Sequence, residues 1–422
     1  MVNIRYTPRH SSTAAKATQQ HQPGVAPPAK NQRHGASRMQ IATISATALA
    51  FLTIVTVFAL RATPTDIRTC TTGTAATGCT LSPPGAATEP LTSILSVEVL
   101  RGARYSFDGP SAVATSGALW VTNVLGNSVT RVTRGGAGQA KDLAASYDLD
   151  GPNALAIGNG RVWIANVPAN SLTEVNESTG QLVRVLSTGY GFSSPNALLV
   201  DGTQLWVTDA ASDSVTKINA SNGHLVRVLG GGKYHFDNPS ALAVADGHLW
   251  VVNSGGDSVT ELNAATGAWL ATRAVGYRFN DPTAIAVQDG QLWVTNEGGD
   301  TVTVLSARTG AVIRVLSGRR YGLDNPVAVA ATSGVIWVAN SLGNSVTEIE
   351  ARSGALVRVL TGRTYHFREP TGIAAGGHTV WITNMSGDSV TRLVTGRPGA
   401  GDSAAHPSRP VPAARTSGAG TG

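Results

Sequence analysis

A small set of histidines and carboxylates interrupts the pattern that most of this 422-residue chain repeats. They stand in short segments rich in Gly, Asn, Asp and Pro, and they are Asp209, His235, Asp281, Glu297, His366 and Glu369. Imidazoles and carboxylates act as general acids and bases in enzymes, and they also bind divalent cations. At a protein surface, the same groups select a partner through charge and hydrogen bonds. Which chemistry applies depends on which of them meet in space.

No motif of a known catalytic class accompanies these residues. The chain lacks the spacings GxSxG, GxxxxGKS, HExxH and CxxC, each of which belongs to a particular reaction or metal site. Its two cysteines, Cys70 and Cys79, lie in CTTGTAATGC, where a local disulfide can close in an exported compartment. Free thiols, or a bond to another chain, are the alternative. Their spacing is not that of a zinc site.

A repeat positions the candidate residues. Tryptophans recur 43 or 44 residues apart, each within a phrase such as LWVTN or IWVAN, at positions 120, 163, 206, 250, 293, 337 and 381. A proline and an alternating apolar stretch precede each phrase, and a turn such as GDSVT follows it. Each unit then holds four short strands, labelled a to d in chain order, and ends in Tyr-x-Phe or Tyr-x-Leu. Four strands in 40–45 residues are typical of a β-propeller blade.

The two ends of the repeat region complete each other. The seventh unit stops after SVTRLV at 389–394 and lacks its fourth strand, while ILSVEVLRG at 94–102 precedes the first unit. We therefore predict an all-β protein with seven four-stranded blades over residues 93–395, in which the N-terminal strand completes the last blade and closes the ring. Small residues on the innermost strands, such as Ala112 and Gly372, fit the crowding expected around the axis.

The W-V-T-N phrase, the preceding P-x-A-x-A-V strand and the trailing G-D-S-V-T resemble YVTN-type and NHL-type β-propeller repeats. The resemblance covers all seven units, about 300 residues. It implies the fold strongly and the function weakly, since this superfold hosts binding scaffolds, kinase sensor ectodomains and enzymes. Streptogramin lyases and gluconolactonase-like enzymes share the architecture and use a histidine or carboxylates with a divalent ion in the central funnel. None of their catalytic residues can be aligned to this sequence.

Charge and hydropathy divide the rest of the chain. Residues 39–60 carry no charge over 22 positions, which is long enough to span a bilayer, so we predict a signal-anchor helix at 39–61. Residues 1–38 hold six basic and no acidic side chains, which places this disordered tail in the cytoplasm and the propeller outside. A cleaved signal peptide is the alternative. We expect a flexible stalk at 62–92 and a disordered tail at 396–422.

The geometry of a four-stranded blade predicts where a ligand binds. The b–c turn and the d–a loop lie at the same end of a blade, so seven copies of each surround the mouth of the channel. We expect the residues that follow the prolines to line this mouth; they are Ser111, Asn153, Asn196, Ser240, Thr283, Val327 and Thr371. The Asn or Asp that ends each Trp phrase should bond turn amides. We expect the Tyr-x-Phe pairs to pack between blades, although a ring of phenols that binds peptide or carbohydrate is the alternative.

Departures from the repeat are the candidates for function, because side chains kept in all seven units serve the fold. Besides the six residues above, they include Leu125, Pro168, Leu342, Arg368 and Met385. Residues 39–422 carry equal numbers of basic and acidic groups, so no nucleic-acid partner is expected.

These observations favour a membrane-anchored, extracytoplasmic binding platform for an envelope protein, a peptide or a glycan, without a cofactor. The alternative is a divalent-metal-dependent lyase or lactonase-type hydrolase, in which Asp209, His235, Asp281 and Glu297 gather in the funnel. A sensor that signals inward is disfavoured, because 38 cytoplasmic residues contain no catalytic domain. The sequence leaves the oligomeric state open.

Overall fold

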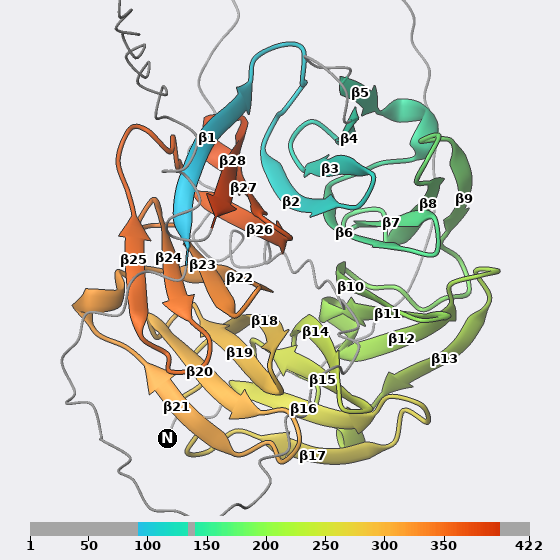
Figure 1. Cartoon of the computed structure of the whole chain (residues 1–422). Helices are drawn as coiled ribbons and strands as arrows, with labels where there is room; N and C mark the ends of the chain where they lie inside the picture. Colours follow the sequence, from blue (N-terminus) through green and yellow to red (C-terminus); the bar gives the residue numbers. More distant parts are fainter. Residues whose placement is uncertain (1–91, 134–139, 397–422) are drawn as a thin grey trace, which may run out of the picture. The chain divides into compact units, whose positions relative to one another are not determined.

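Residues 92–133 and 140–396 are described by a computed structural model (Figure 1). The predicted cytoplasmic tail, membrane helix, stalk and C-terminal tail lie almost wholly outside these residues, as do Cys70 and Cys79. Within the described ranges, no helix is both long enough and apolar enough to cross a membrane.

Seven antiparallel four-stranded sheets form the blades of a ring (Figure 1). Written from the innermost strand a to the outermost strand d, the first four blades are β2 (Pro110–Thr115), β3 (Ala118–Asn123), β4 (Ser128–Thr133) and β5 (Ala140–Leu143); β6 (Pro152–Gly158), β7 (Arg161–Asn166), β8 (Ser171–Asn176) and β9 (Leu182–Leu186); β10 (Pro195–Asp201), β11 (Gln204–Asp209), β12 (Ser214–Asn219) and β13 (Leu225–Gly230); β14 (Pro239–Ala245), β15 (His248–Asn253), β16 (Ser258–Asn263) and β17 (Trp269–Arg273).

The remaining three blades are β18 (Pro282–Gln288), β19 (Gln291–Asn296), β20 (Thr301–Ser306) and β21 (Val312–Leu316); β22 (Pro326–Thr332), β23 (Val335–Asn340), β24 (Ser345–Glu350) and β25 (Leu356–Leu360); β26 (Pro370–Gly376), β27 (Thr379–Asn384), β28 (Ser389–Gly396) and β1 (Ser93–Arg101). Short 3-10 turns lie in the connections; they are η1 (Ala145–Tyr147), η2 (Ala210–Ser212), η3 (Gly232–Tyr234), η4 (Arg319–Tyr321) and η5 (Met385–Gly387). The innermost strands of adjacent blades pack against one another.

The ring closes as the sequence predicts. Strand β1 pairs antiparallel with β28, from Ser93 opposite Gly396 to Arg101 opposite Ser389. The N-terminal strand thus supplies the outer strand of the seventh blade. Both the number of blades and this closure are confirmed.

Tryptophan packing explains why each unit needs its apolar phrase. Six of the seven phrase tryptophans are fully buried, and only Trp381 in the last blade is partly exposed. Burying one such side chain stabilises the fold by several kcal/mol at about 25 cal/mol per Å². Space is short near the axis, since a Cβ added to Gly372 would lie 2.5 Å from the carbonyl oxygen of Ser111.

The Tyr-x-Phe pairs pack between blades, as expected from the sequence. Tyr105 stacks on Phe107 with ring centroids 5.4 Å apart, and Tyr234 stacks on Phe236 at the same distance. The hydroxyl of Tyr147 donates to the carbonyl oxygen of Gly180 in the next blade (2.9 Å). These rings therefore belong to the seams between blades.

A second contact joins every blade to the next, and we call it the inter-blade latch. The Oδ1 atom of an Asn or Asp in the b–c turn accepts the backbone N–H of the residue before the next proline, at 2.7–3.0 Å. The seven pairs are Asn127–Gly151, Asn170–Ser194, Asp213–Asn238, Asp257–Asp281, Asp300–Asn325, Asn344–Glu369 and Asp388–Gly109.

Both partners of a latch have left-handed backbone, with φ of 43–49° for the acceptors and 50–60° for the donors. Asn, Asp and Gly adopt this conformation most readily, which explains their recurrence in these turns. The last latch, Asp388–Gly109, links the seventh blade to the first.

Replacing Asp388 tests the latch where the ring closes. Asp388→Gly keeps the left-handed backbone without strain but removes the acceptor, so we expect the free energy of unfolding to fall by about 1 kcal/mol. Asp388→Asn retains a side-chain oxygen and should leave stability close to the parent. Chemical denaturation measures both variants, and equal stability of Asp388→Gly and the parent would contradict a stabilising latch.

Candidate functional site

The residues after the prolines do not line an open mouth, which corrects the expectation from sequence. All seven are buried, with at most 8% of the residue exposed. Hydroxyl groups among them join adjacent blades: Ser111 Oγ donates to the carbonyl oxygen of Pro152 (3.3 Å), and Thr371 Oγ1 donates to that of Pro110 (3.3 Å). Because the innermost strands lie close together around the axis, these hydroxyls reach the backbone carbonyl oxygens of the adjacent blade and form hydrogen bonds with them.

The Asn that ends a Trp phrase also bonds differently from the expectation. In the first blade, Asn123 Nδ2 donates to the hydroxyls of Ser128 (3.1 Å) and Thr130 (2.9 Å), not to turn amides. Thr130 Oγ1 then donates to the carbonyl oxygen of Tyr105 (2.8 Å). The same chain from amide to hydroxyl to carbonyl occurs at Asn166, Asn253, Asn296, Asn340 and Asn384.

Asp209 occupies this buried position in the third blade and reverses the hydrogen bond. Thr216 Oγ1 donates to Asp209 Oδ2 (2.7 Å), and the backbone N–H of Ser193 approaches Oδ1 at 3.4 Å. Burial raises the pKa of Asp209 to about 7, although the Thr216 hydroxyl and the Ser193 amide favour the ionised form. Asp209 is fully buried, so it is placed inside a blade and not at a ligand-accessible surface.

Asp281 and Glu297 are brought together by neighbouring loops. The backbone N–H of Glu297 donates to the carbonyl oxygen of Asp281 (2.9 Å). Burial raises the pKa of both carboxyls, and the charge of Asp257 adds to the effect on Asp281. For Glu297, a hydrogen bond from Asn325 Nδ2 (3.0 Å) opposes this rise, while the charge of Asp281 adds to it.

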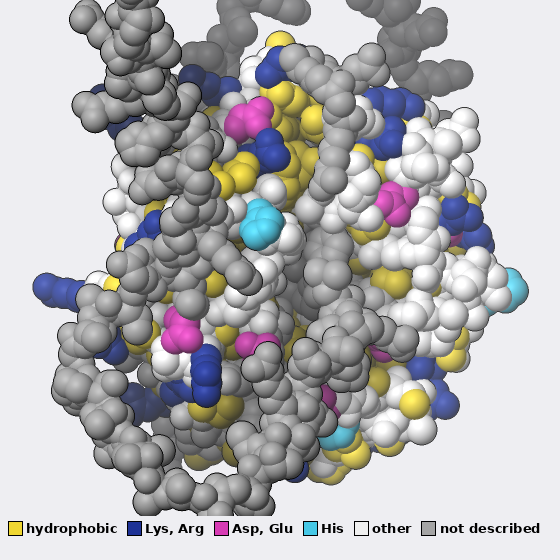
Figure 2. All heavy atoms as spheres, in the orientation of Figure 1, with side chains coloured by type: hydrophobic (Ala, Val, Ile, Leu, Met, Phe, Trp, Pro, Cys, Tyr) yellow, Lys and Arg dark blue, Asp and Glu magenta, His cyan; other side chains and the backbone are white. Residues whose placement is uncertain are grey.

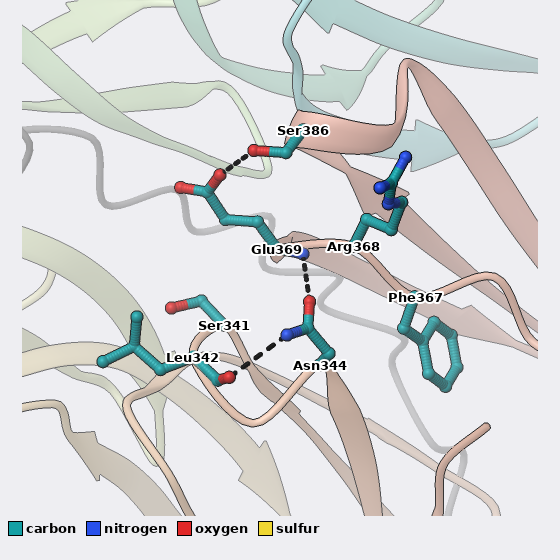
Figure 3. A pocket seen from close by; sticks show the side chains of 7 residues that line it. All are labelled: Ser341, Leu342, Asn344, Phe367, Arg368, Glu369 and Ser386. Carbon is teal, nitrogen blue, oxygen red and sulfur yellow. Dashed lines mark hydrogen bonds between the residues drawn. The ribbon is translucent and has the colours of Figure 1, made fainter. Parts of the chain in front are cut away.

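A hydrogen-bonded link leads from Glu297 to a cavity of about 500 Å³ beside the sixth and seventh blades. Ser341 Oγ donates to Asn325 Oδ1, and Asn325 in turn donates to Glu297. We call the cavity the mouth pocket; it is lined by Ser341, Leu342, Asn344, Phe367, Arg368, Glu369 and Ser386 (Figure 3). Its lining comes from b–c turns and one d–a loop, the segments in which the sequence places functional departures.

Glu369 is fixed within the mouth pocket. Its carboxylate accepts a hydrogen bond from Ser386 Oγ, and its backbone N–H forms the latch to Asn344 (2.7 Å). Its φ is 54°, an uncommon conformation for a glutamate. Arg368 is adjacent, yet its guanidinium extends away from this carboxylate (Figure 3), and no ion pair joins the two within the described residues. Both charges are thus available to a ligand.

Leu342 gives the mouth pocket an apolar rim. Its relative exposure is 68%. Phe367 is buried and stacks on Tyr365 at 5.4 Å, so its ring belongs to the seam between blades.

The two predicted histidines lie elsewhere. His235 is exposed, and its ring centroid lies 5.8 Å from that of Trp269 on the outer strand β17. His366 is exposed beside Phe367, but it does not line the mouth pocket. Within residues 92–133 and 140–396, no group of three His, Cys, Asp or Glu side chains is placed to hold a metal ion. The structure therefore brings Asp281 to Glu297, and it does not assemble the four-residue cation site considered from sequence.

Three polar residues that line the mouth pocket are not among the candidates from sequence. Asn344 occupies a turn position that is Asn or Asp in all seven blades, whereas Ser341 is matched by a serine only at Ser254, and Ser386 stands where the other blades have Leu, Pro, Ala or Gly. The repetition of Asn344 indicates a structural role, and its side chain does form a latch. The proximity of these three residues to Arg368 and Glu369 is a property of the folded ring, although the departure of Ser386 from the repeat is visible in the sequence.

Comparisons with known proteins identify the fold and not a family. No protein-family model and no curated protein sequence matches the chain. Among solved structures, a streptogramin B lyase is 18% identical with a TM-score of 0.61, covering 73% of this chain and 100% of that one. Virginiamycin B lyase from Staphylococcus aureus is 17% identical with a TM-score of 0.60, covering 71% and 99%. The hydrazine synthase of Kuenenia stuttgartiensis is 16% identical with a TM-score of 0.56, covering 68% and 96%.

Asp209 predicts a stability that depends on pH. Its folded pKa of about 7 lies above the ordinary value of 3.8, so its contribution to stability is full below pH 4 and is lost as pH rises towards 7. Asp209→Asn restores the residue of the other blades. We expect this variant to be more stable than the parent at pH 8, by up to roughly 4 kcal/mol, and equally stable near pH 4.

Unfolding free energies between pH 4 and pH 8 measure this difference. The matched control is Asn296→Asp, which introduces the same carboxyl into the fifth blade and should create the same loss of stability at high pH. Parallel pH profiles for the parent and Asp209→Asn would contradict the raised pKa.

Proposed function

We propose that this chain is a membrane-anchored, extracytoplasmic binding platform, and that the mouth pocket receives a peptide segment of a partner protein in the cell envelope. The observation that carries the proposal is the convergence of three departures from the repeat, Leu342, Arg368 and Glu369, around one cavity. Because the units of the domain are nearly identical, these three residues distinguish the loops around this cavity from the other loops on the same face.

The chemistry of the lining favours a peptide. A peptide supplies apolar side chains for Leu342 and groups of either sign for Arg368 and Glu369. Carbohydrate sites commonly offer an exposed aromatic face, whereas the one aromatic residue of the mouth pocket, Phe367, is buried. A glycan is therefore the less suitable of the ligands considered.

The mouth pocket is also preorganised. The latch from Asn344 to Glu369 fixes the backbone, and the hydrogen bond from Ser386 fixes the carboxylate. A ligand that binds here does not have to order these groups, so less of the binding free energy is lost.

The surroundings are consistent with a partner that is neither a nucleic acid nor strongly charged. On the visible part of the face in Figure 2, acidic and basic side chains are interspersed, and neither sign forms a continuous surface. The uncharged segment at 39–60, with its preceding basic tail, supports an anchor that places the propeller outside the membrane.

The enzymatic alternative, a divalent-metal-dependent lyase or lactonase-type hydrolase, draws only on the fold shared with the solved lyases. One fold supports many functions. No observation on the described residues favours this chemistry over binding.

Selection of peptides tests the proposal. A displayed peptide library is selected on the detergent-solubilised full chain, and the affinities of enriched peptides are measured for two variants. Leu342→Ser removes the apolar rim, and Glu369→Gln removes the charge but keeps an oxygen for Ser386. We expect each variant to weaken binding about tenfold, as loss of a central interface contact does.

Leu125→Ser is the matched control. Leu125 stands in the corresponding turn of the first blade and is 64% exposed, but it does not line the mouth pocket. Its substitution should leave the affinity within about twofold of the parent. Peptides that bind Leu342→Ser and Glu369→Gln as tightly as the parent would place the site elsewhere.

A further inference from the structure

A second cavity of about 480 Å³ lies at the seam between the third and fourth blades and shares no residue with the mouth pocket. Its walls are formed by β11, β12, β13, η3 and the turn between β16 and β17. They comprise Trp206, Lys217, Val226, Arg227, Leu229, Lys233, Tyr234 and residues 265–268. We call it the seam pocket.

The corresponding position in three other blades carries a glutamate that neutralises an arginine of the outer strand. Glu174 pairs with Arg184 (2.7 Å), Glu261 with Arg273 (2.8 Å), and Glu348 with Arg358 (2.6 Å). The three glutamates are almost fully buried, so their charges compensate the arginines directly.

The third blade has a lysine where these blades have glutamate. Lys217 lies opposite Arg227 across β12 and β13, as Glu174 lies opposite Arg184 and Glu348 opposite Arg358. The arginine is thus retained while the acid that neutralises it is replaced by a second cation.

Lys217 is held in place without a carboxylate. Its Nζ atom donates to the carbonyl oxygens of Ala265 (3.0 Å) and Ala264 (3.4 Å), and it lies 4.6 Å from the centroid of the Trp206 ring. An ammonium group has three N–H donors, so one remains after these two bonds. Only 8% of the residue is exposed, and burial together with the charge of Arg227 lowers its pKa, against the opposing charge of Asp201.

Two further cations line the same cavity. Arg227 Nη1 donates to the carbonyl oxygen of Thr266 (3.0 Å), and Lys233 Nζ lies 4.8 Å from the centroid of the Tyr234 ring. The lining contains three basic side chains and no Asp or Glu. Three positive charges around one cavity, whose lining holds no acid, favour a ligand group with two negative charges over one with a single charge.

We propose that the seam pocket binds the phosphoryl group of a small phosphorylated molecule, such as a polyol or sugar phosphate. Lys217 and Arg227 contact the phosphoryl oxygens, since both are suited to phosphate recognition. The volume exceeds that of a phosphate group, and the apolar side chains of Val226 and Leu229 provide contacts for a carbon skeleton. This site is separate from the peptide site proposed above and does not depend on it.

Calorimetric titration of the detergent-solubilised full chain with glycerol 1-phosphate tests the proposal, with succinate as the carboxylate probe of equal charge. Lys217→Glu installs the residue of the second, fourth and sixth blades, which lets it pair with Arg227 as the glutamates there pair with their arginines. We expect this variant to weaken glycerol 1-phosphate binding at least tenfold, because loss of the cation is joined by repulsion. Arg227→Gln, at an exposed position, should also weaken glycerol 1-phosphate binding, and it provides the test if Lys217→Glu does not fold.

Lys141→Glu is the matched control, since it makes the same change of charge at an exposed site in the first blade. It should bind glycerol 1-phosphate as the parent does. Absence of binding to the parent, or equal binding by Lys217→Glu or Arg227→Gln, would overturn the proposal. Succinate binding as tight as that of glycerol 1-phosphate would overturn the assignment to a phosphoryl group.

Discussion

One hydrogen bond, repeated at every seam, holds the ring in register: the side-chain oxygen of a b–c turn residue accepts the backbone N–H before the next proline. Each latch needs an Asn or Asp in left-handed conformation on one side and a tolerant residue on the other. Its geometry explains why the turns repeat Gly-Asn-Ser or Gly-Asp-Ser and why Gly, Asn, Asp or Ser usually precedes the proline. The burial of one tryptophan per blade then stabilises blades that are already aligned.

The mouth pocket shares two residues with a latch. The pair Asn344–Glu369 is one of the seven latches and lies in its lining, so a structural contact and a candidate binding group occupy the same loop. Glutamate at this pre-proline position is the exception among the seven donors. The carboxylate it adds is aligned by Ser386 and not by the repeat. The binding site that we propose thus combines residues that depart from the repeat with a latch that every blade shares.

The blades, their number and the closing strand follow from the sequence because a 43-residue period and four apolar segments per unit allow few other folds. Whether a residue that departs from the repeat is buried or lies on the loop face does not follow from the sequence in the same way. Asp209 and Glu297 are both carboxylates close to a Trp phrase, yet Asp209 ends a strand inside the blade while Glu297 lies one residue past the end of its strand. A shift of one position decides between burial and the loop face.

Contacts between blades were the least predictable feature. The basic seam pocket depends on Lys217, which looks like an ordinary polar residue in its strand. Its part in a basic cavity is seen only in the structure, where it lies beside Arg227 and the turn of the next blade. The folding of the ring brings these segments together, although the turn is distant along the chain. The expectation that residues such as Ser111 line an open mouth is wrong for a similar reason. The sequence shows that they lie on the innermost strands, but it does not show how little space remains around the axis.

Hydrogen exchange of the full chain, resolved to single amides, tests the central claim that latches fix the loop face. The seven donor amides lie in loops at the ends of the blades, where exchange is ordinarily fast. We predict that the amides of Gly109, Gly151, Ser194, Asn238, Asp281, Asn325 and Glu369 exchange at least about a hundredfold more slowly than those of His235 and His366 in the same kind of loop. Exchange of the seven at the rate of these two histidines would show that the latches do not hold the ring.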